Sequence, residues 1–263
     1  MKAFFFDIDG TLIDSFGGVR TISPNVIEQL ERLHAVGHKL VICSGRPYAM
    51  IGEDLRLPLF DAYVMCNGAH VEADGRTLFT NVMDAALARN FAELFEDLGM
   101  EYMLQTAHHI YLRRDFCLIQ RFFAEFAQPS IFTFDFDRDE VWERTIKLEA
   151  HATELDHARV REAVEGRAGY TAHMDGNGSY NAFEIYSPTI SKAVGIGLVL
   201  EHYGIAVENS YGFGDGINDL EMIQAVGTGV AMGNACSELK QAADVICGTV
   251  KEDGLARYLA MVE

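Results

Sequence analysis

The chain has 263 residues, of which 49% are hydrophobic, so it can bury the core of one large domain or of two modest ones. Lys and Arg total 21 and Asp and Glu total 39, which gives a formal net charge of −18. This balance argues against a nucleic-acid partner, which needs clustered positive charge, and against docking on an anionic membrane. A small phosphorylated partner stays compatible with it, because one local positive site suffices to bind such a molecule.

The cysteines and the apolar runs indicate a cellular compartment. The five cysteines, at positions 43, 66, 117, 236 and 247, follow neither a Cys-x-x-Cys nor a zinc-finger spacing, and we expect free thiols in a reducing environment. The apolar stretch before Asp7 is too short for a signal peptide, and no apolar run approaches the roughly 20 residues that span a bilayer. We therefore expect a soluble, cytoplasmic protein, and no obligate protein partner is inferred.

The first eighty residues alternate strands and helices. Ser23 and Pro24 predict the start of a helix, and Gly37 predicts its end. The elements expected here are a buried strand over 3–7, a helix over 24–36, strands over 39–43 and 62–66, and a hairpin around Asp74-Gly75. Strands and helices at this spacing predict a parallel sheet with right-handed crossovers.

Residues 82–186 follow a different pattern, which predicts an inserted α+β domain. Asp84 is expected to cap a helix that Gly99 ends, with apolar positions at the 3.6-residue period: Leu87, Phe91, Leu94, Phe95 and Leu98. Further elements are expected as strands near 101–105 and 109–113, a helix near 115–126, strands near 145–150, 169–173 and 181–186, and a helix near 154–165.

The α/β rhythm returns from residue 187. The expected elements are a helix over 191–203, a strand over 210–214, a helix over 219–226, a strand over 228–231, a helix over 236–242, a strand over 244–246 and a helix over 253–261. We therefore predict one domain formed by residues 1–81 and 187–263, with residues 82–186 inserted into it.

A pair of acids closes the first predicted strand. Asp7 and Asp9 project to the same side of an extended backbone, and Gly10 allows a sharp turn after them. Like charges this close favour an oxygen-preferring cation such as Mg²⁺. A strand that ends in a polar turn explains the same residues equally well.

Two further groups lie at predicted element ends. Ser44-Gly45-Arg46-Pro47 follows the strand over 39–43, where a hydroxyl and a backbone N–H can hold a phosphoryl oxygen. Taken alone, this stretch is explained better as a plain turn. Lys192 follows Ser191 in the first turn of a predicted helix, where the dipole favours anions, so its charge suggests a bound anion or a solvated surface position.

The fourth group is the segment from Gly212 to Leu220. Asp215 ends a predicted strand, Asn218 is expected to cap the next helix, and Asp219 adds a third polar side chain. The glycine spacing is wrong for a dinucleotide-binding loop, whereas a merely tight turn stays open. Because the carboxyl ends of parallel strands meet at one edge of a sheet, the four groups together indicate a site for a divalent metal and a phosphate.

These motifs, DIDGT, SGRP, SK and GDGIND in that order, resemble those of the Cof-type phosphatases of the haloacid dehalogenase superfamily. The stretches 66–69, 227–235 and 252–254 resemble the Cof pattern as well, whereas Ala193 stands where that type usually has Gly. The resemblance implies an α/β fold, namely a Rossmann-like parallel sheet core with an inserted α+β cap domain that determines substrate specificity. The implied activity is Mg²⁺-dependent hydrolysis of small phosphorylated metabolites, with sugar phosphates foremost.

The resemblance also implies a role for each motif residue. Asp7 is the nucleophile that forms an aspartyl-phosphate, and Asp9 is the general acid and base. Asp7, Asp215 and the backbone carbonyl of Asp9 hold Mg²⁺, while Asp219 orients the residues around the metal. The transferring phosphoryl group is held by Ser44, Gly45, Lys192 and Asn218.

Other functions stay open at this point. A phosphomutase would return the phosphoryl group to a sugar, and a sugar-phosphate sensor would bind without turnover, although such a sensor has little use for an acid/base at Asp9. A nucleotide-cofactor enzyme is disfavoured by the glycine spacing. The inserted segment offers polar or aromatic candidates for specificity to which no role is assigned: His108, His109, Arg113, Arg114, Trp142 and Lys147.

Overall fold

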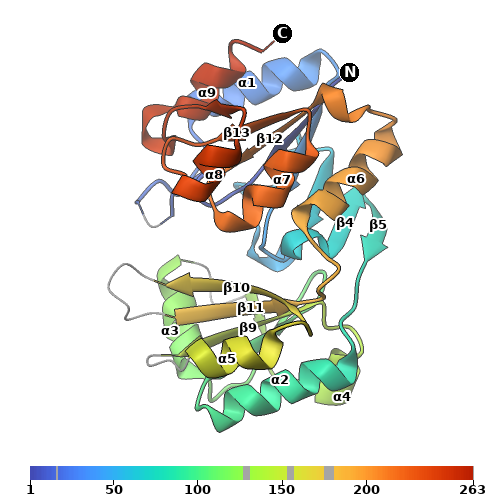
Figure 1. Ribbon diagram of the computed structural model, residues 1–263, viewed down its shortest axis with the longest axis vertical. Helices are drawn as coiled ribbons and strands as arrows, with labels where there is room; N and C mark the ends of the chain where they lie inside the picture. The colour runs from blue at the N-terminus through green and yellow to red at the C-terminus, as the bar shows by residue number, and fades with distance from the viewer. Residues whose placement is uncertain (16, 127–130, 153–156, 175–180, 263) are drawn as a thin grey trace. The chain divides into compact units, whose positions relative to one another are not determined.

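The computed structural model describes residues 1–15, 17–126, 131–152, 157–174 and 181–262 (Figure 1). The chain divides into two compact units. The core unit consists of Met1–Gly45, Ile51–Phe79 and Ser191–Glu263, and the inserted unit consists of Arg46–Met50 and Thr80–Ile190.

A largely parallel sheet forms the centre of the core unit. Its strands are, in order across the sheet, β14 (Val245–Ile246), β13 (Thr228–Ala231), β12 (Ser210–Gly214), β1 (Ala3–Phe6), β2 (Lys39–Cys43), β3 (Ala62–Met65), β4 (His70–Ala73) and β5 (Arg76–Thr80). Neighbouring strands from β14 to β3 run parallel, and β4 returns antiparallel to β3. The predicted α/β fold class is confirmed.

Helices cover this sheet on both faces, as a parallel sheet requires. They are α1 (Pro24–Ala35), α6 (Lys192–Tyr203), α7 (Leu220–Ala225), α8 (Ser237–Ala242) and α9 (Gly254–Leu259). α1 packs beside α9, while α6 lies beside α7 and α7 beside α8. Ser23 caps α1 as expected, because its hydroxyl accepts a hydrogen bond from the Val26 amide at 3.2 Å.

Strand β1 is apolar on both sides because both of its faces are buried. Phe4 stacks on Tyr211 and Phe6 stacks on Phe213, with ring centroids 4.9 Å and 5.0 Å apart. Phe5 points to the opposite face and packs in the cluster that includes residues of α6 and α7. Strand β1 lies in the interior of the sheet, with β12 on one side and β2 on the other.

The strand register brings the predicted motifs to one edge. Phe6 lies opposite Phe213 on one side and opposite Ile42 on the other. The next residue along β1 is therefore Asp7, and the loops that leave β2 and β12 begin beside it. The Asp7 amide donates to the Phe213 carbonyl at 2.9 Å, which continues this pairing by one residue.

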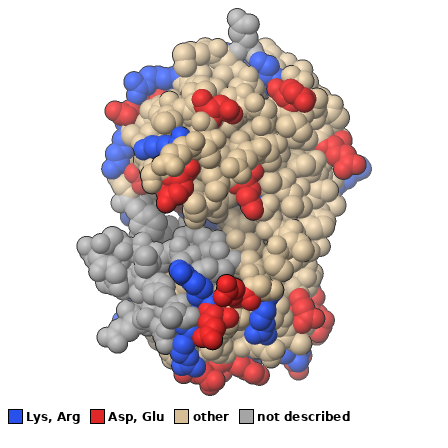
Figure 2. Space-filling view, in the orientation of Figure 1, with Lys and Arg blue, Asp and Glu red and all other residues tan. Residues whose placement is uncertain are grey.

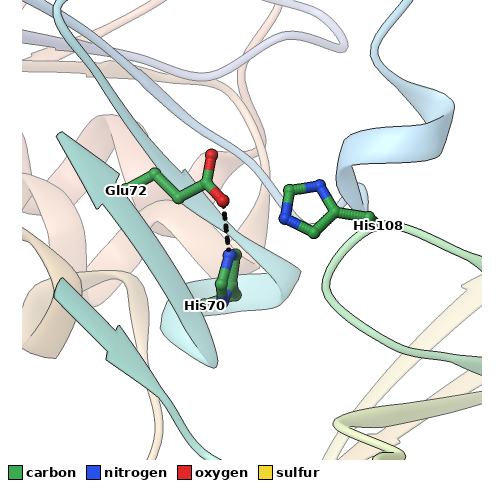
Figure 3. A group of neighbouring side chains, drawn as sticks. All are labelled: His70, Glu72 and His108. Carbon is green, nitrogen blue, oxygen red and sulfur yellow. Dashed lines mark hydrogen bonds and ion pairs between the residues drawn. The ribbon is translucent and has the colours of Figure 1, made fainter. Parts of the chain in front are cut away.

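The hairpin between β4 and β5 turns at Asp74 and Gly75, as predicted, with φ of 50° and 71°. The strand expected over 62–66 ends at Met65, because the next two residues take left-handed conformations, with φ of 50° and 56°. On β4, a ring nitrogen of His70 lies 3.0 Å from the Glu72 carboxylate, on the same side of the strand (Figure 3).

The inserted unit has an α+β pattern around a mixed sheet. Its strands are, in order, β10 (Gly169–Met174), β11 (Asn181–Tyr186), β9 (Lys147–Ala152), β6 (Glu101–Gln105), β7 (Ile110–Leu112) and β8 (Phe132–Thr133). Its helices are α2 (Ala85–Asp97), α3 (Cys117–Phe126), α4 (Arg138–Trp142) and α5 (His157–Val164). Asp84 caps α2, since its carboxylate accepts from the Leu87 amide at 2.8 Å.

Two elements of this unit were not predicted. Strand β8 has two residues and helix α4 has five, so neither is long enough to show a hydrophobic period. The helix expected near 154–165 is observed as α5, and residues 153–156 lie outside the described residues.

The described helices of both units are too short or too polar to cross a membrane. All five cysteines are free, as expected from their number and spacing.

Candidate active site

A buried lysine joins two carboxylates at the carboxyl edge of the core sheet. Lys192, the first residue of α6, donates from Nζ to Asp7 Oδ1 at 2.6 Å and to Asp219 Oδ1 at 2.5 Å. Lys192 is 1% exposed, Asp219 0% and Asp7 6%. Buried ions need partners, so this geometry excludes the alternative of a solvated surface lysine.

Asp215 reaches the same place from the end of β12. A Cβ placed on Gly10 would lie 2.0 Å from Asp215 Oδ2, and Gly10 has φ of +79°. Glycine is therefore required in DIDGT both for the left-handed turn and for the approach of this carboxylate. The first and the fourth motif meet at this contact.

Asp219 also organises the loop that carries Asp215. Its Oδ2 accepts hydrogen bonds from the amides of Asp215 and Gly216, at 2.9 Å and 3.0 Å. A Cβ on Gly214 would lie 2.4 Å from Asp219 Cγ, so only glycine fits where the chain turns around this carboxylate. Asp219 thus fixes the loop with one oxygen and Lys192 with the other.

The second motif approaches through Asn67. Ser44 is 2% exposed, and its carbonyl accepts from the Asn67 amide at 3.1 Å. A Cβ on Gly45 would lie 3.0 Å from Asn67 Oδ1, and the Asn218 amide donates to that same oxygen at 3.3 Å. Asn218 therefore does not cap the next helix as predicted: its side chain crosses to the loop after β3, because the turn is already closed by Asp219.

Asp9 lies on the turn that follows β1. Its backbone forms an isolated β-bridge with Ile13, and its Oδ1 accepts a hydrogen bond from the Ser15 hydroxyl at 3.4 Å. Its charge contributes to the raised pKa of both Asp7 and Asp215, so it belongs to the same electrostatic cluster. All eight predicted site residues lie in the core unit.

Burial and mutual repulsion shift the acids of this cluster. Burial raises the pKa of Asp7 well above its usual value, although the Lys192 ammonium opposes that shift. Burial, followed by the charge of Asp219, raises the pKa of Asp215 to about 7. Burial works against the charge on Lys192, but the carboxylates of Asp219 and Asp7 outweigh it and raise the Lys192 pKa.

The cluster fits a divalent cation. Carboxylate oxygens of Asp7, Asp215 and Asp219 all lie within 4.8 Å of one another. When these acids are ionised, the ammonium of Lys192 leaves two negative charges unbalanced. Hard oxygen ligands with this excess charge are what Mg²⁺ prefers, and a bound cation would relieve the repulsion that raises the carboxyl pKa values.

Sequence reasoning assigned no role to Asn67 or Asn234. Asn67 accepts from Asn218, whereas Asn234 donates to the Gly10 carbonyl at 2.7 Å and faces Asp215 Oδ2 at 3.4 Å. Both residues follow a strand of the parallel sheet, which is the signal that could have marked them. Ala193, which departs from the Cof pattern, is half-buried in the first turn of α6.

A family model described as haloacid dehalogenase-like hydrolase matches residues 4–259. The chain belongs to the haloacid dehalogenase-like hydrolases. A 5-amino-6-(5-phospho-D-ribitylamino)uracil phosphatase of Bacillus subtilis, YitU, is 29% identical over 96% of this chain and 94% of its own length. The pyridoxal phosphate phosphatase YbhA of Escherichia coli is 26% identical over 98% of this chain and 97% of its own.

The solved structures agree. The subclass IIB sugar phosphatase BT4131 of the haloacid dehalogenase superfamily superposes with a TM-score of 0.83 at 26% identity, covering 99% of this chain and 98% of the other. The predicted membership in the Cof-type phosphatases is confirmed, and this haloacid dehalogenase-like hydrolase is a phosphatase.

Proposed function

We propose that the protein is a Mg²⁺-dependent phosphohydrolase that cleaves phosphate monoesters of small metabolites through an aspartyl-phosphate on Asp7. The observation that carries the proposal is the buried Asp7–Lys192–Asp219 bridge beside Asp215. A carboxylate nucleophile needs its charge offset before it can approach a phosphate, and this arrangement supplies a fixed cation next to it.

In the first half-reaction, an oxygen of Asp7 attacks phosphorus and forms a new P–O bond. The ester P–O bond on the opposite side breaks, and the leaving oxygen takes a proton from the carboxyl group of Asp9. Lys192 stays protonated through this step, because Asp7 and Asp219 both favour its charged form.

In the second half-reaction, a water molecule attacks the phosphorus of the aspartyl-phosphate. Asp9, now a carboxylate, takes a proton from that water, the bond between Asp7 and phosphorus breaks, and inorganic phosphate leaves. Both residues return to their starting states. A structure that matches this chain with a TM-score of 0.84 at 26% identity, over 99% of this chain and 98% of the other, is described as showing a trigonal-bipyramidal intermediate of phosphoryl transfer.

We propose that Mg²⁺ is held by Asp7, Asp215 and the backbone carbonyl of Asp9, with Asp219 orienting this group of ligands. When bound, Mg²⁺ supplies positive charge that offsets the charge of the phosphoryl oxygens. The residues that would hold those oxygens themselves are the Ser44 hydroxyl, the Gly45 amide, Lys192 and Asn218.

The substrate class follows from the relatives and from charge. The matched phosphatases are named for a ribityl phosphate, for pyridoxal phosphate and for sugar phosphates, which are all small phosphorylated molecules. On the face in Figure 2, the acidic and basic side chains of the described residues are interspersed, so those residues form no basic tract for a nucleic acid there. We propose sugar phosphates as the first group to test.

We further propose that residues 1–81 and 187–263 carry the chemistry and that residues 82–186 form the cap that recognises the leaving group. The phosphate-handling residues contact only the transferred group, so specificity must come from elsewhere. The free cysteines support a reducing compartment, and we propose the cytoplasm.

The test compares Asp7→Asn with Asp54→Asn, which makes the same change in an exposed loop of the core unit. A panel of phosphorylated metabolites is incubated with Mg²⁺, and released phosphate is measured. We expect Asp7→Asn to lose turnover by at least about a thousandfold, because an amide cannot serve as the nucleophile, while Asp54→Asn retains it.

Full activity of Asp7→Asn would overturn the mechanism. A hexose phosphate that isomerises without release of phosphate would indicate a phosphomutase instead. Saturable binding of sugar phosphates by the wild type, with no turnover of any of them, would indicate a sensor.

A further inference from the structure

Asn234 stands at the junction of three loops of the core unit. Its Nδ2 donates to the Gly10 carbonyl at 2.7 Å and lies 3.4 Å from Asp215 Oδ2. Its Oδ1 accepts from the Val250 amide at 3.2 Å. The orientation of the Asn234 amide is therefore fixed, because a backbone amide can only donate and a backbone carbonyl can only accept.

The backbone around Asn234 is held on both sides. The Met232 amide donates to the Gly214 carbonyl and the Cys236 amide to the Asp215 carbonyl, each at 2.9 Å. The Gly233 amide donates to the Gly248 carbonyl at 3.0 Å, which ties the segment to the C-terminal turn. The position of the Asn234 side chain is thus set by main-chain bonds rather than by its own rotamer alone.

The C-terminal turn, formed by residues 248–254, is itself held by hydrogen bonds. The amide and hydroxyl of Thr249 donate to Glu252 Oε2, at 3.1 Å and 2.8 Å, and the Gly254 amide donates to the Thr249 carbonyl at 2.9 Å. This turn contains the Glu252-Asp253-Gly254 stretch, whose role the catalytic motifs leave unexplained. It presents the Val250 amide that orients Asn234.

We propose that Asn234 is a positioning residue that holds the Asp215 carboxylate against the Gly10 turn, so that Asp215 can serve the metal site. The reason is electrostatic: carboxylate oxygens of Asp7 and Asp219 lie within 4.8 Å of one on Asp215, and an unrestrained carboxylate would rotate away from these like charges toward solvent. The Asn234 amide offers donors to Asp215 and to Gly10 and so holds the two together. This inference rests on the proposed function, since it gives Asp215 a metal to bind.

The experiment measures Mg²⁺ binding directly, by calorimetric titration of MgCl₂ into protein that was freed of metal by a chelator. Asn234→Leu keeps the branched shape and removes the amide. We expect its dissociation constant for Mg²⁺ to rise about 10- to 100-fold, the usual effect of removing a group that orients a metal ligand. The Mg²⁺ concentration for half-maximal phosphate release rises by the same factor, while kcat at saturating Mg²⁺ changes less than about threefold.

The matched control is Asn209→Leu, which makes the same change on an exposed residue just before β12, at the opposite end of that strand from Asp215. Asn209→Leu should bind Mg²⁺ like the wild type. If Asn234→Leu fails to fold in a thermal melt, Asn234→Ala removes the same amide with less bulk and should show the same rise.

The outcomes separate the two proposals. Wild-type Mg²⁺ affinity in the folded Asn234 variant, with binding lost in Asp215→Asn, overturns the role of Asn234 and leaves the metal site intact. A wild type that binds no Mg²⁺, or an Asp215→Asn variant that binds it normally, overturns the metal site and the role of Asn234 together.

Discussion

Replacement of Asp215 by Asn should stabilise the metal-free protein. The pKa of Asp215 is raised from 3.8 to about 7, chiefly by burial and then by the charge of Asp219. A shift of roughly three units, at 1.36 kcal/mol per unit, means that holding this carboxylate ionised in the folded state costs about 4 kcal/mol at pH 7 and above. Asn has the same shape without the charge and can still accept from Asn234, so we expect a gain of about 2–4 kcal/mol.

The sign with pH is fixed by linkage. The pKa of Asp215 is higher in the folded state than in the unfolded state, so this carboxyl group does not destabilise the wild type below about pH 4, where it is protonated in both states. As the pH rises toward 7, the free energy of unfolding of the wild type falls. The difference in this free energy between Asp215→Asn and the wild type should therefore grow from about pH 4 and become constant near pH 7. At about 2–4 °C per kcal/mol, a gain of about 2–4 kcal/mol should raise the melting temperature of the variant by about 4–16 °C in that upper pH range.

The assay is differential scanning calorimetry in a chelator between pH 4.5 and 8, with Asp54→Asn as the control. Adding Mg²⁺ should raise the melting temperature of the wild type and leave Asp215→Asn unmoved, so that the difference shrinks. A variant that is less stable than the wild type, or a difference that is constant across this pH range, would refute the reasoning.

Three further outcomes are expected. Lys192→Met leaves Asp7 and Asp219 buried without their cation. In a urea titration at pH 8, the free energy of unfolding should fall by about 3–5 kcal/mol. A urea midpoint equal to that of the wild type would contradict the burial argument. Gly10→Ala places a Cβ against Asp215 and strains a left-handed residue, so calorimetry should show weakened Mg²⁺ binding, and normal binding would count against the contact. Chelation of wild-type protein should stop phosphate release and leave the far-UV circular dichroism unchanged, with activity returning on addition of Mg²⁺; activity that survives exhaustive chelation would exclude the metal.

The sheet could be predicted because its strands are buried on both faces. The run Ala3–Phe6 is wholly apolar, and the same holds for most of Lys39–Cys43, so their length and composition identify central strands without any long-range information. The topology then follows from the crossover rules, and the position of Asp7 beside the loops after β2 and β12 follows from the topology.

The contacts between loops of the site could not be predicted from the sequence. The position of Asn218 before a helix predicts a cap, but its side chain extends instead to Asn67, which lies in a loop about 150 residues earlier in the chain. Asn234 is exposed and polar, and although it follows a strand of the parallel sheet, its hydrogen bonds to Gly10 and Val250 are visible only in the structure. Such contacts are set by the packing of loops, which neither local propensity nor periodicity encodes.

The central position of β1 has a consequence for synthesis of the chain. Ala3 pairs with Lys39 soon after it is made, but its other neighbour, Ser210, is synthesised only after the whole inserted unit. Until β12 arrives, three consecutive phenylalanines, Phe4 to Phe6, occupy an open sheet edge, which is a template for association with other chains. Nascent chains of this protein should therefore depend on a chaperone, or on a low concentration of other nascent chains, until β12 has been synthesised. A truncation that ends before residue 210 should aggregate even though it retains every residue of the inserted unit.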